Sequence, residues 1–178
     1  MNNMQEKQII IINGTGGSGK DTFVDFCKKY AKVMNFSSID KVKEIATLIG
    51  WDGKKREKDR KFLSDLKKLT TEYNDMPFNS IKYAVNDFNN SDNEILFVHI
   101  REPEEVNRAA ITFGAKTLLV KREGLKNIDT NYSDASVDNY NYDYIINNTT
   151  LEELDIKALD FVKKIKNNKQ KHLSKIKK

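Results

Sequence analysis

The sequence of 178 residues predicts one α/β domain, a three-layer α/β/α fold in which helices cover both faces of a mainly parallel sheet. Two observations lead to this prediction. Short apolar runs alternate with stretches whose apolar residues recur at helical spacing, which is the pattern of strands joined by crossover helices. One run, residues 94–100, is apolar almost without interruption, as expected for a parallel strand that is buried on both faces. No repeat or linker divides the chain, so we expect a single domain over residues 1–178.

The first half of the chain carries two predicted strands that are each followed by a helix. Residues 8–13 form the first strand and end at a cluster of glycines, and a helix begins near Lys20. Residues 33–39 form the second strand, and the helix after it is expected to stop near residues 50–53, which include two glycines. Two more helices are expected, one that carries Phe62, Leu63, Leu66 and Leu69 and one over residues 79–88.

The second half is expected to complete the sheet. Strands are predicted at residues 94–100, 116–120 and 142–146. Pro103 is placed to open the helix after the first of these strands, because the first turn of a helix does not use the N–H that proline lacks. The last helix is expected to begin at Thr149 or Thr150. Thr150 is followed three residues later by Glu153, which is the spacing of a capping box.

Composition limits the classes of function. The net charge of +5 suits an anionic substrate. Much of the excess lies in residues 163–178, a solvated basic tail, so we expect no specific nucleic-acid partner. No apolar run is long enough to cross a bilayer, and we expect a cytoplasmic protein with no membrane partner. Cys27 is the only cysteine, which excludes an internal disulfide and a cysteine-rich metal site.

A glycine-rich motif stands between the first strand and the first helix. Residues 14–20 read Gly-Thr-Gly-Gly-Ser-Gly-Lys, which is the spacing of a P-loop in the context that the motif requires. Glycines let successive backbone N–H groups point into one concavity and bind phosphate, and Lys20 adds a mobile cation. The motif predicts that the chain holds the phosphates of ATP through Gly14, Thr15, Gly16, Gly17, Ser18, Gly19, Lys20, Asp21 and Thr22.

One position departs from the usual motif, because Asp21 stands where a serine or threonine normally offers its hydroxyl to Mg²⁺. Asp21 could bind the metal through water, or it could cap the start of the helix. Thr22 could still bind a phosphate or the metal. The sequence leaves these roles open, and both residues are candidate ligands of a magnesium ion.

Several segments, in the same order, resemble deoxynucleoside monophosphate kinases of the phage type, which are among the adenylate-kinase-like P-loop kinases. Residues 18–22 of the phosphate loop are the most specific of these, although phosphomevalonate kinases share the Gly-Lys-Asp variant. The family's acidic residue near the end of the central strand falls at His99, and a proline of the family falls at Val42. The other similar segments are residues 39–44 with 48–51, residues 101–105, and residues 142–148 with 151–154.

The resemblance implies transfer of phosphate from ATP, with Mg²⁺, to a phosphorylated acceptor that is expected to be a (deoxy)nucleoside monophosphate. It also implies an acceptor-binding helical region at about residues 40–90 and small nucleotides as partners, and it allows a homodimer. Residues at about 122–139 are expected to form either a lid or a plain loop. Two alternatives stay open for the activity. One is a P-loop kinase for another small metabolite, such as phosphomevalonate or a coenzyme precursor, and the other is a nucleotide-binding regulatory protein that no longer transfers phosphate.

The candidate catalytic residues besides Lys20 lie at the ends of predicted strands, where open α/β sheets bind ligands. Asp40 could orient or deprotonate the acceptor, hold metal-bound water, or simply cap the next helix. Arg101 could make a bidentate contact with an acceptor phosphate or pair with Glu105. Catalysis is thus assigned to Lys20, Asp40 and Arg101. Acceptor binding is assigned to Asp40, Lys41, Lys43, Arg60 and Arg101, of which Arg60 rests on the family resemblance; the lysines and Arg60 could instead be solvated surface charges.

Three other features have two interpretations each. Lys121 and Arg122 follow a predicted strand, and they could reach donor phosphates or lie in a solvated loop. Trp51 could stack on a base, although an aromatic residue beside a helix-ending glycine more often serves packing. His99 lies in an apolar strand, where we expect a core histidine with its hydrogen bonds satisfied rather than a catalytic base.

Overall fold

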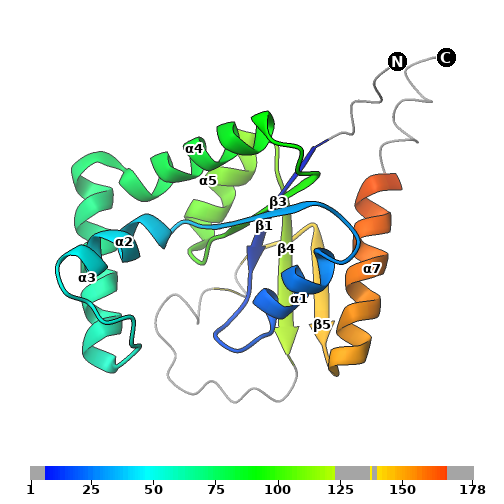
Figure 1. The fold of residues 1–178 in the computed structure, drawn as a ribbon, viewed down its shortest axis with the longest axis horizontal. Helices are drawn as coiled ribbons and strands as arrows, with labels where there is room; N and C mark the ends of the chain where they lie inside the picture. The colour runs from blue at the N-terminus through cyan, green and yellow to red at the C-terminus, as the bar shows by residue number, and fades with distance from the viewer. Residues whose placement is uncertain (1–6, 123–136, 138–139, 168–178) are drawn as a thin grey trace.

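The computed structural model describes residues 7–122, 137 and 140–167. Its elements are β1 (Gln8–Asn13), α1 (Lys20–Cys27), β2 (Val33–Ser37), α2 (Asp40–Leu48), α3 (Glu57–Asn74), α4 (Met76–Asn90), β3 (Ile95–His99), α5 (Pro103–Phe113), β4 (Lys116–Arg122), β5 (Tyr144–Asn148) and α7 (Leu151–Asn167) (Figure 1). Within these ranges, no helix is both long and apolar enough to span a membrane. Of the predicted lid at residues 122–139, all but Arg122 and Val137 lie outside the described residues, as does the tail from residue 168 onward.

The described strands form one parallel sheet in the order β2-β3-β1-β4-β5. β1 lies in the middle, and Ile12 is in register with His99 of β3 on one side and with Leu118 of β4 on the other. All strands run the same way, so their carboxyl ends meet at one edge, the lower edge in Figure 1. The predicted α/β class is confirmed, and the topology gathers the segments that follow β1, β2 and β3 at this edge.

Alternate residues of β1 supply two separate cores, one on each face of the sheet. Ile10 and Ile12 belong to a cluster with residues of α1 and α7, in which Phe161 packs edge-on against Phe23. Ile11 belongs to the cluster on the opposite face, with residues of α4 and α5. The period of two along a strand therefore produces the predicted three layers, because it gives each face of the sheet its own apolar surface for helices to cover.

Two element boundaries in the first half differ from the prediction. The strand predicted over residues 33–39 ends at Ser37, because the chain leaves the sheet there and turns into α2. The helix predicted over residues 79–88 begins earlier, at Met76. Asp75 explains this start: its φ of 55° ends α3 in a left-handed turn and lets α4 begin at the next residue.

The last strand is displaced by two residues from its prediction. Residues 142–146 were the expected range, whereas β5 spans Tyr144–Asn148. A long-range hydrogen bond accounts for the difference, because the carboxylate of Asp143 accepts the backbone N–H of Thr117 at 2.8 Å. A side chain thus takes the place of the strand ladder at this position, and the regular pairing with β4 begins only at the next residue.

The start of α7 uses both threonines that were considered as caps. The hydroxyl of Thr150 accepts the backbone N–H of Glu153 at 3.2 Å, as the capping-box spacing predicts. The carboxylate of Glu153 instead accepts a hydrogen bond from the hydroxyl of Thr149. Thr150 therefore caps helix α7, which begins at Leu151, while the Thr149 hydroxyl holds the Glu153 side chain.

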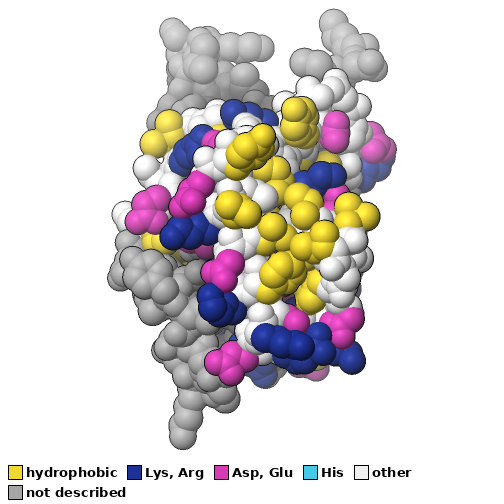
Figure 2. Space-filling model, turned by 90° about the vertical axis from the view of Figure 1, so that its left-hand side faces the viewer, with side chains coloured by type: hydrophobic (Ala, Val, Ile, Leu, Met, Phe, Trp, Pro, Cys, Tyr) yellow, Lys and Arg dark blue, Asp and Glu magenta, His cyan; other side chains and the backbone are white. Residues whose placement is uncertain are grey.

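The region formed by α2 and α3 packs away from the two main cores. Its own cluster has Val42, Ala46 and Leu63 as buried residues. α3 is 18 residues long, and of these only Asp59 and Leu63 are buried. Hydrophobic side chains gather on the surface at the end of the molecule that these helices form (Figure 2), where the exposed large apolar residues of α2, α3 and their junction include Leu48, Ile49, Leu69 and Tyr73.

Candidate functional site

The predicted phosphate loop connects the carboxyl end of β1 to the start of α1. Gly19 is the N-cap of this helix, with φ of 92° and ψ of 15°, and no side chain caps the helix. The loop is closed by a hydrogen bond from the N–H of Ser18 to the carbonyl of Thr15, at 3.2 Å. Because the first turn of a helix leaves its N–H groups without helical partners, this end of α1 offers donors to an anion.

Two glycines of the loop sit where no other residue fits. A Cβ on Gly14 would lie 2.5 Å from the carbonyl oxygen of Val120, which is backbone and cannot move aside cheaply. A Cβ on Gly19 would lie 2.3 Å from Nδ2 of Asn148, and the positive φ of Gly19 disfavours a side chain in any case. The loop therefore lies tightly against β4 and β5, and Gly14 and Gly19 are required by packing as well as by the motif.

Two buried asparagines hold the loop in place. The Oδ1 atom of Asn13 accepts the N–H of Gly14 at 2.7 Å, and its Nδ2 donates to the carbonyl of Arg101 at 2.9 Å and to the hydroxyl of Tyr142 at 2.8 Å. Asn148 donates from Nδ2 to the carbonyl of Ser18 at 2.9 Å. Sequence analysis missed both residues. Their only signal was a polar residue at the end of an apolar strand, beside the glycine-rich loop or before the last helix.

The side chains of the loop are arranged around its backbone. Nζ of Lys20 lies 3.0 Å from the carbonyl oxygen of Gly14 and 3.3 Å from that of Thr15, so the ammonium folds back over the loop. The hydroxyl of Ser18 is the one buried side-chain polar atom without a hydrogen-bond partner in the described part of the chain. A backbone cradle, a cation and an unpaired hydroxyl in one loop fit the binding of a phosphate chain.

The two candidate metal ligands lie at the start of α1. The side chain of Asp21 is 84 % exposed, and it does not cap the helix, so the capping alternative is not observed. Thr22 is half-buried beside it. Within the described ranges no group of three or more histidine, cysteine or acidic side chains could hold a metal ion. A cation at this position would therefore need phosphate or water oxygens as further ligands.

Asp40 lies at the same edge of the sheet, in the first turn of α2. Its Oδ2 accepts the N–H of Ser37 at 2.9 Å, and its Oδ1 accepts a hydrogen bond from Nζ of Lys43 at 3.2 Å. The N-cap position belongs to Ile39, so Asp40 does not cap α2 in the way that was considered. It fastens the end of β2 to the helix and holds Lys43. Lys41 instead points into an exposed pair with Glu44.

His99 is largely buried and hydrogen-bonded, as the sequence predicts, but it also lies beside the phosphate loop. Its Nε2 is 2.8 Å from Oδ1 of Asn35, and the residue lies at the carboxyl end of β3. Its Nδ1 is 3.7 Å from Oδ1 of Asp21. Burial lowers the pKa of His99 to about 4; the nearby Asp21 carboxylate opposes this shift and the Lys20 ammonium adds to it. The imidazole is therefore neutral at pH 7 and belongs to the candidate site.

The two arginines predicted to bind the acceptor lie in different parts of the structure. Arg101 follows β3 at the carboxyl edge, and its side chain is exposed. Its backbone carbonyl accepts a hydrogen bond from Asn13, the residue that also holds the phosphate loop. Arg60 lies exposed on α3 and does not line the pocket described below. Lys121 and Arg122 are exposed at the end of β4. Of the predicted acceptor ligands, the structure therefore brings Asp40, Lys43 and Arg101 to the edge that carries the phosphate loop, and it leaves Arg60 on the helical region.

The alternative partner proposed for Arg101 is engaged elsewhere. Nζ of Lys67, on α3, lies 2.7 Å from Glu102 and 2.9 Å from Glu105, and its side chain is only 14 % exposed. Burial raises the pKa of Glu105, whereas the Lys67 ammonium overcomes the effect of burial and holds the pKa of Glu102 below its usual value. This partly buried trio, which the sequence did not reveal, links α3 to the start of α5 immediately after Arg101.

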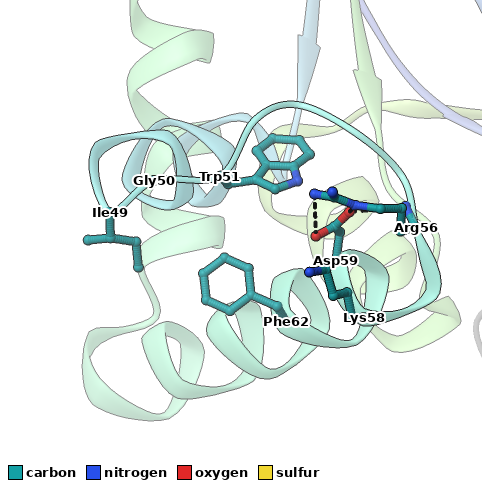
Figure 3. A pocket seen from close by; sticks show the side chains of 7 residues that line it. All are labelled: Ile49, Gly50, Trp51, Arg56, Lys58, Asp59 and Phe62. Carbon is teal, nitrogen blue, oxygen red and sulfur yellow. Dashed lines mark hydrogen bonds and ion pairs between the residues drawn. The ribbon is translucent and has the colours of Figure 1, made fainter.

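A pocket of about 320 Å³ opens between the end of α2 and the start of α3. The rings of Trp51 and Phe62 border it, and an ion pair between Arg56 and Asp59 lies beside them (Figure 3). Trp51 also packs against the small core of this region, and its indole N–H donates to the carbonyl of Lys54 at 2.9 Å. The packing interpretation of Trp51 is thus confirmed, and part of its surface also borders a cavity. Stacking of Trp51 on a base stays a prediction. The full lining is Ile49, Gly50, Trp51, Arg56, Lys58, Asp59 and Phe62.

Solved structures of kinases share this fold. Shikimate kinase from Aquifex aeolicus superposes with a TM-score of 0.53 at 11% identity, over 88% of this chain and 96% of that chain. A candidate kinase from Chloroflexus aurantiacus has a TM-score of 0.51 at 10% identity, over 90% and 98% of the two chains. Thymidylate kinase from Ehrlichia chaffeensis is less similar, with a TM-score of 0.45 at 10% identity over 88% and 99%. No family model and no curated protein matches the sequence. The likeness shows that the chain has the P-loop kinase fold.

Proposed function

We propose that this chain is a kinase that transfers the γ-phosphoryl group of ATP to a small phosphorylated acceptor, namely a (deoxy)nucleoside monophosphate. The observation that carries the proposal is the loop between β1 and α1, where Gly14 and Gly19 leave no room for a side chain and Lys20 folds over the backbone. A backbone cradle of this kind at a helix N-terminus, with a lysine above it, binds the β- and γ-phosphates of a nucleotide.

In the proposed reaction, an oxygen of the acceptor phosphate attacks the γ-phosphorus of ATP. A new P–O bond forms, and the bond from the γ-phosphorus to the β–γ bridging oxygen breaks, so that ADP leaves. Such a transfer needs charge neutralisation and positioning more than covalent chemistry from the protein. Lys20 would neutralise charge on the donor, and Arg101 would hold the acceptor phosphate with two parallel N–H bonds. Asp40 and Lys43 would orient the acceptor from the adjacent strand end.

A divalent cation is part of this proposal, and Mg²⁺ is the one that the family resemblance implies. It would neutralise charge on the donor phosphates. Asp21 and Thr22 would hold it, since both lie on the first turn of α1 next to the loop and carry the oxygen ligands that hard cations prefer. The phosphates themselves would supply the remaining ligands.

The acceptor is proposed to be a nucleotide because of the pocket beside α2. Asp40 begins this helix and the pocket lies at its other end, about 14 Å away along the helix at 1.5 Å per residue. Trp51 and Phe62 give the pocket flat aromatic walls that a base could contact, and Arg56 provides hydrogen-bond donors for its polar edge. An acceptor with a phosphate at one end and a planar base at the other suits this arrangement.

A screen of acceptors with ATP tests the proposal. ADP formation would be measured with each nucleoside and deoxynucleoside monophosphate, with phosphomevalonate, and with phosphorylated coenzyme precursors. We expect turnover with one or a few of the monophosphates. Turnover only with a non-nucleotide acceptor would support the kinase activity but reject a nucleotide as the acceptor. ATP binding without any product would favour a regulatory protein.

Lys20→Ala tests the donor site itself. We expect turnover to fall by on the order of a hundredfold or more, because the variant loses a cation that stabilises charge in the transition state. Its melting temperature should stay close to that of the parent protein, because the side chain contributes little to the core. Lys28→Ala is the matched control, since Lys28 is an exposed lysine paired with Asp25. Equal turnover in a folded Lys20→Ala protein would reject the phosphate-loop assignment.

A further inference from the structure

The ring of His99 is held in one orientation by its neighbour on β2. Its Nε2 lies 2.8 Å from the amide oxygen of Asn35, and an amide oxygen can only accept a hydrogen bond. The proton of the neutral imidazole is therefore on Nε2, and Nδ1 carries a lone pair. A histidine whose far nitrogen is fixed by a hydrogen bond in this way has its other nitrogen prepared to bind a metal ion.

The lone pair of Nδ1 faces a second electron donor. Oδ1 of Asp21 is 3.7 Å from Nδ1, which is too long for a hydrogen bond. Two ligands of one cation, each bonded at about 2.1 Å, lie roughly 3.0–3.5 Å apart. The side chain of Asp21 is 84 % exposed and free to rotate, so closing the difference of a few tenths of an ångström requires no movement of the core.

We propose that His99 and Asp21 together bind one divalent cation at the donor phosphates, and that the imidazole gives this site a preference for Mn²⁺ over Mg²⁺. The inference rests on the proposed function, because the nucleotide phosphates supply the remaining ligands. No third histidine, cysteine or acidic side chain joins the pair among the described residues. With the Thr22 hydroxyl beside them, His99 and Asp21 leave positions open for phosphate and water oxygens, as in sites where a divalent cation is bound by a few protein ligands together with the substrate phosphates.

The preference follows from ligand chemistry. Mg²⁺ is a hard cation that is bound through oxygen ligands in a strict octahedral shell. Mn²⁺ also suits oxygen ligands, but as a first-row transition metal it loses less affinity than Mg²⁺ when one oxygen ligand is exchanged for an imidazole nitrogen. The family's acidic residue at this strand end falls at His99 in this chain, so a nitrogen stands where an oxygen donor is expected. Asp21 occupies the position at which the phosphate-loop motif normally binds the metal. The two residues that depart from the motifs thus lie next to each other in space.

The test measures metal binding directly, with a non-hydrolysable ATP analogue bound. Mn²⁺ is titrated into the complex while its free concentration is followed by electron paramagnetic resonance, and Mg²⁺ is then added in competition. We expect the ratio of the Mg²⁺ to the Mn²⁺ dissociation constant to fall on the order of tenfold or more in His99→Asp, which exchanges the nitrogen ligand for oxygen. Electron spin echo modulation from ¹⁴N should appear on bound Mn²⁺ in the parent protein and vanish in His99→Asp and in His99→Gln.

The matched control is His172→Gln, which removes the other histidine of the chain. This variant should keep the nitrogen modulation and the same ratio of the Mg²⁺ to the Mn²⁺ dissociation constant. Asp21→Asn should weaken the binding of both cations, and Mn²⁺ should still bind more tightly than Mg²⁺. If the parent protein binds the analogue but shows no nitrogen modulation, or if His99→Asp leaves the ratio unchanged, the proposal is wrong. If the parent protein does not bind the analogue at all, the proposed function fails instead, so the two outcomes are distinguishable.

Discussion

The phosphate loop and the α2–α3 region both follow strands at the carboxyl edge of the sheet, but different interactions hold them in place. Around the loop, buried polar side chains fix the backbone directly: Asn13 and Asn148 are both less than a tenth exposed, and each binds loop backbone. In the α2–α3 region, ion pairs such as Lys61 with Asp65 are mostly exposed, and the local core is small. Exposed pairs of this kind contribute little to stability.

This difference separates two requirements of the proposed reaction. Donor binding depends on backbone N–H groups, whose positions must be set by the core. Acceptor binding depends on side chains such as Arg101 and Phe62, which can change without disturbing that core. We therefore expect substitutions near the loop to act on stability and all substrates together, whereas substitutions in and beside the helical region should act on the acceptor alone.

The largest effect is expected from Gly14→Ala. Its Cβ would lie 2.5 Å from the carbonyl oxygen of Val120, so the loop or β4 must shift. We expect a loss of about 3 kcal/mol in the free energy of unfolding, at the upper end for overpacking, measured by urea denaturation. Gly16→Ala is the control, because a Cβ there meets nothing within 4 Å. A similar small loss in both variants would show that the loop is not packed as described.

Asn13→Leu removes hydrogen bonds while keeping the volume of the side chain similar. The N–H of Gly14 and the carbonyl of Arg101 would lose their partner, at a cost of about 2 kcal/mol in the free energy of unfolding. Asn79→Leu is the control: this half-buried asparagine of α4 makes an exposed hydrogen bond to the carbonyl of Asn74, and its loss should cost less than about 0.5 kcal/mol. Equal costs for the two variants would mean that the buried hydrogen bonds of Asn13 stabilise the loop no more than an exposed hydrogen bond stabilises a helix.

Arg101→Lys is expected to act on the acceptor only. Lysine keeps the charge but loses the planar fork, so the Michaelis constant for the acceptor or the turnover efficiency should worsen on the order of ten- to a hundredfold, with ATP affinity nearly unchanged. Arg60→Lys is the control and should have little effect, since Arg60 is exposed on α3. If Arg101→Lys weakens the binding of ATP and of the acceptor equally, Arg101 belongs to the donor site.

The smallest effect is expected from Leu69→Ser in a monomer. Leu69 is 62% exposed on α3, so its replacement should change the free energy of unfolding by less than about 0.5 kcal/mol. The same variant tests the expected homodimer, which would bury part of the apolar surface seen in Figure 2. Sedimentation equilibrium of the parent protein and the variant decides this: a dimer that dissociates on substitution would place the interface on α3.

Local patterns in the sequence were sufficient for the elements and the loop. The apolar run in residues 8–13 and the helical period after Lys20 depend only on near neighbours, and the structure has β1 and α1 at these places. The spacing of residues 14–20 is local as well, so the loop and its flanking elements could be located. The parallel sheet followed from the alternation of strand and helix, because parallel strands need long crossovers.

Contacts between distant segments needed the tertiary structure. Sequence alone predicted that His99 is buried but not that it lies beside Asp21 of α1, because Asp21 is 78 positions earlier in the chain. The same holds for the trio formed by Lys67 with Glu102 and Glu105. Which charges meet depends on the strand order and on how helices pack over the sheet, and these are set by the summed burial of the whole core rather than by the spacing of any one motif.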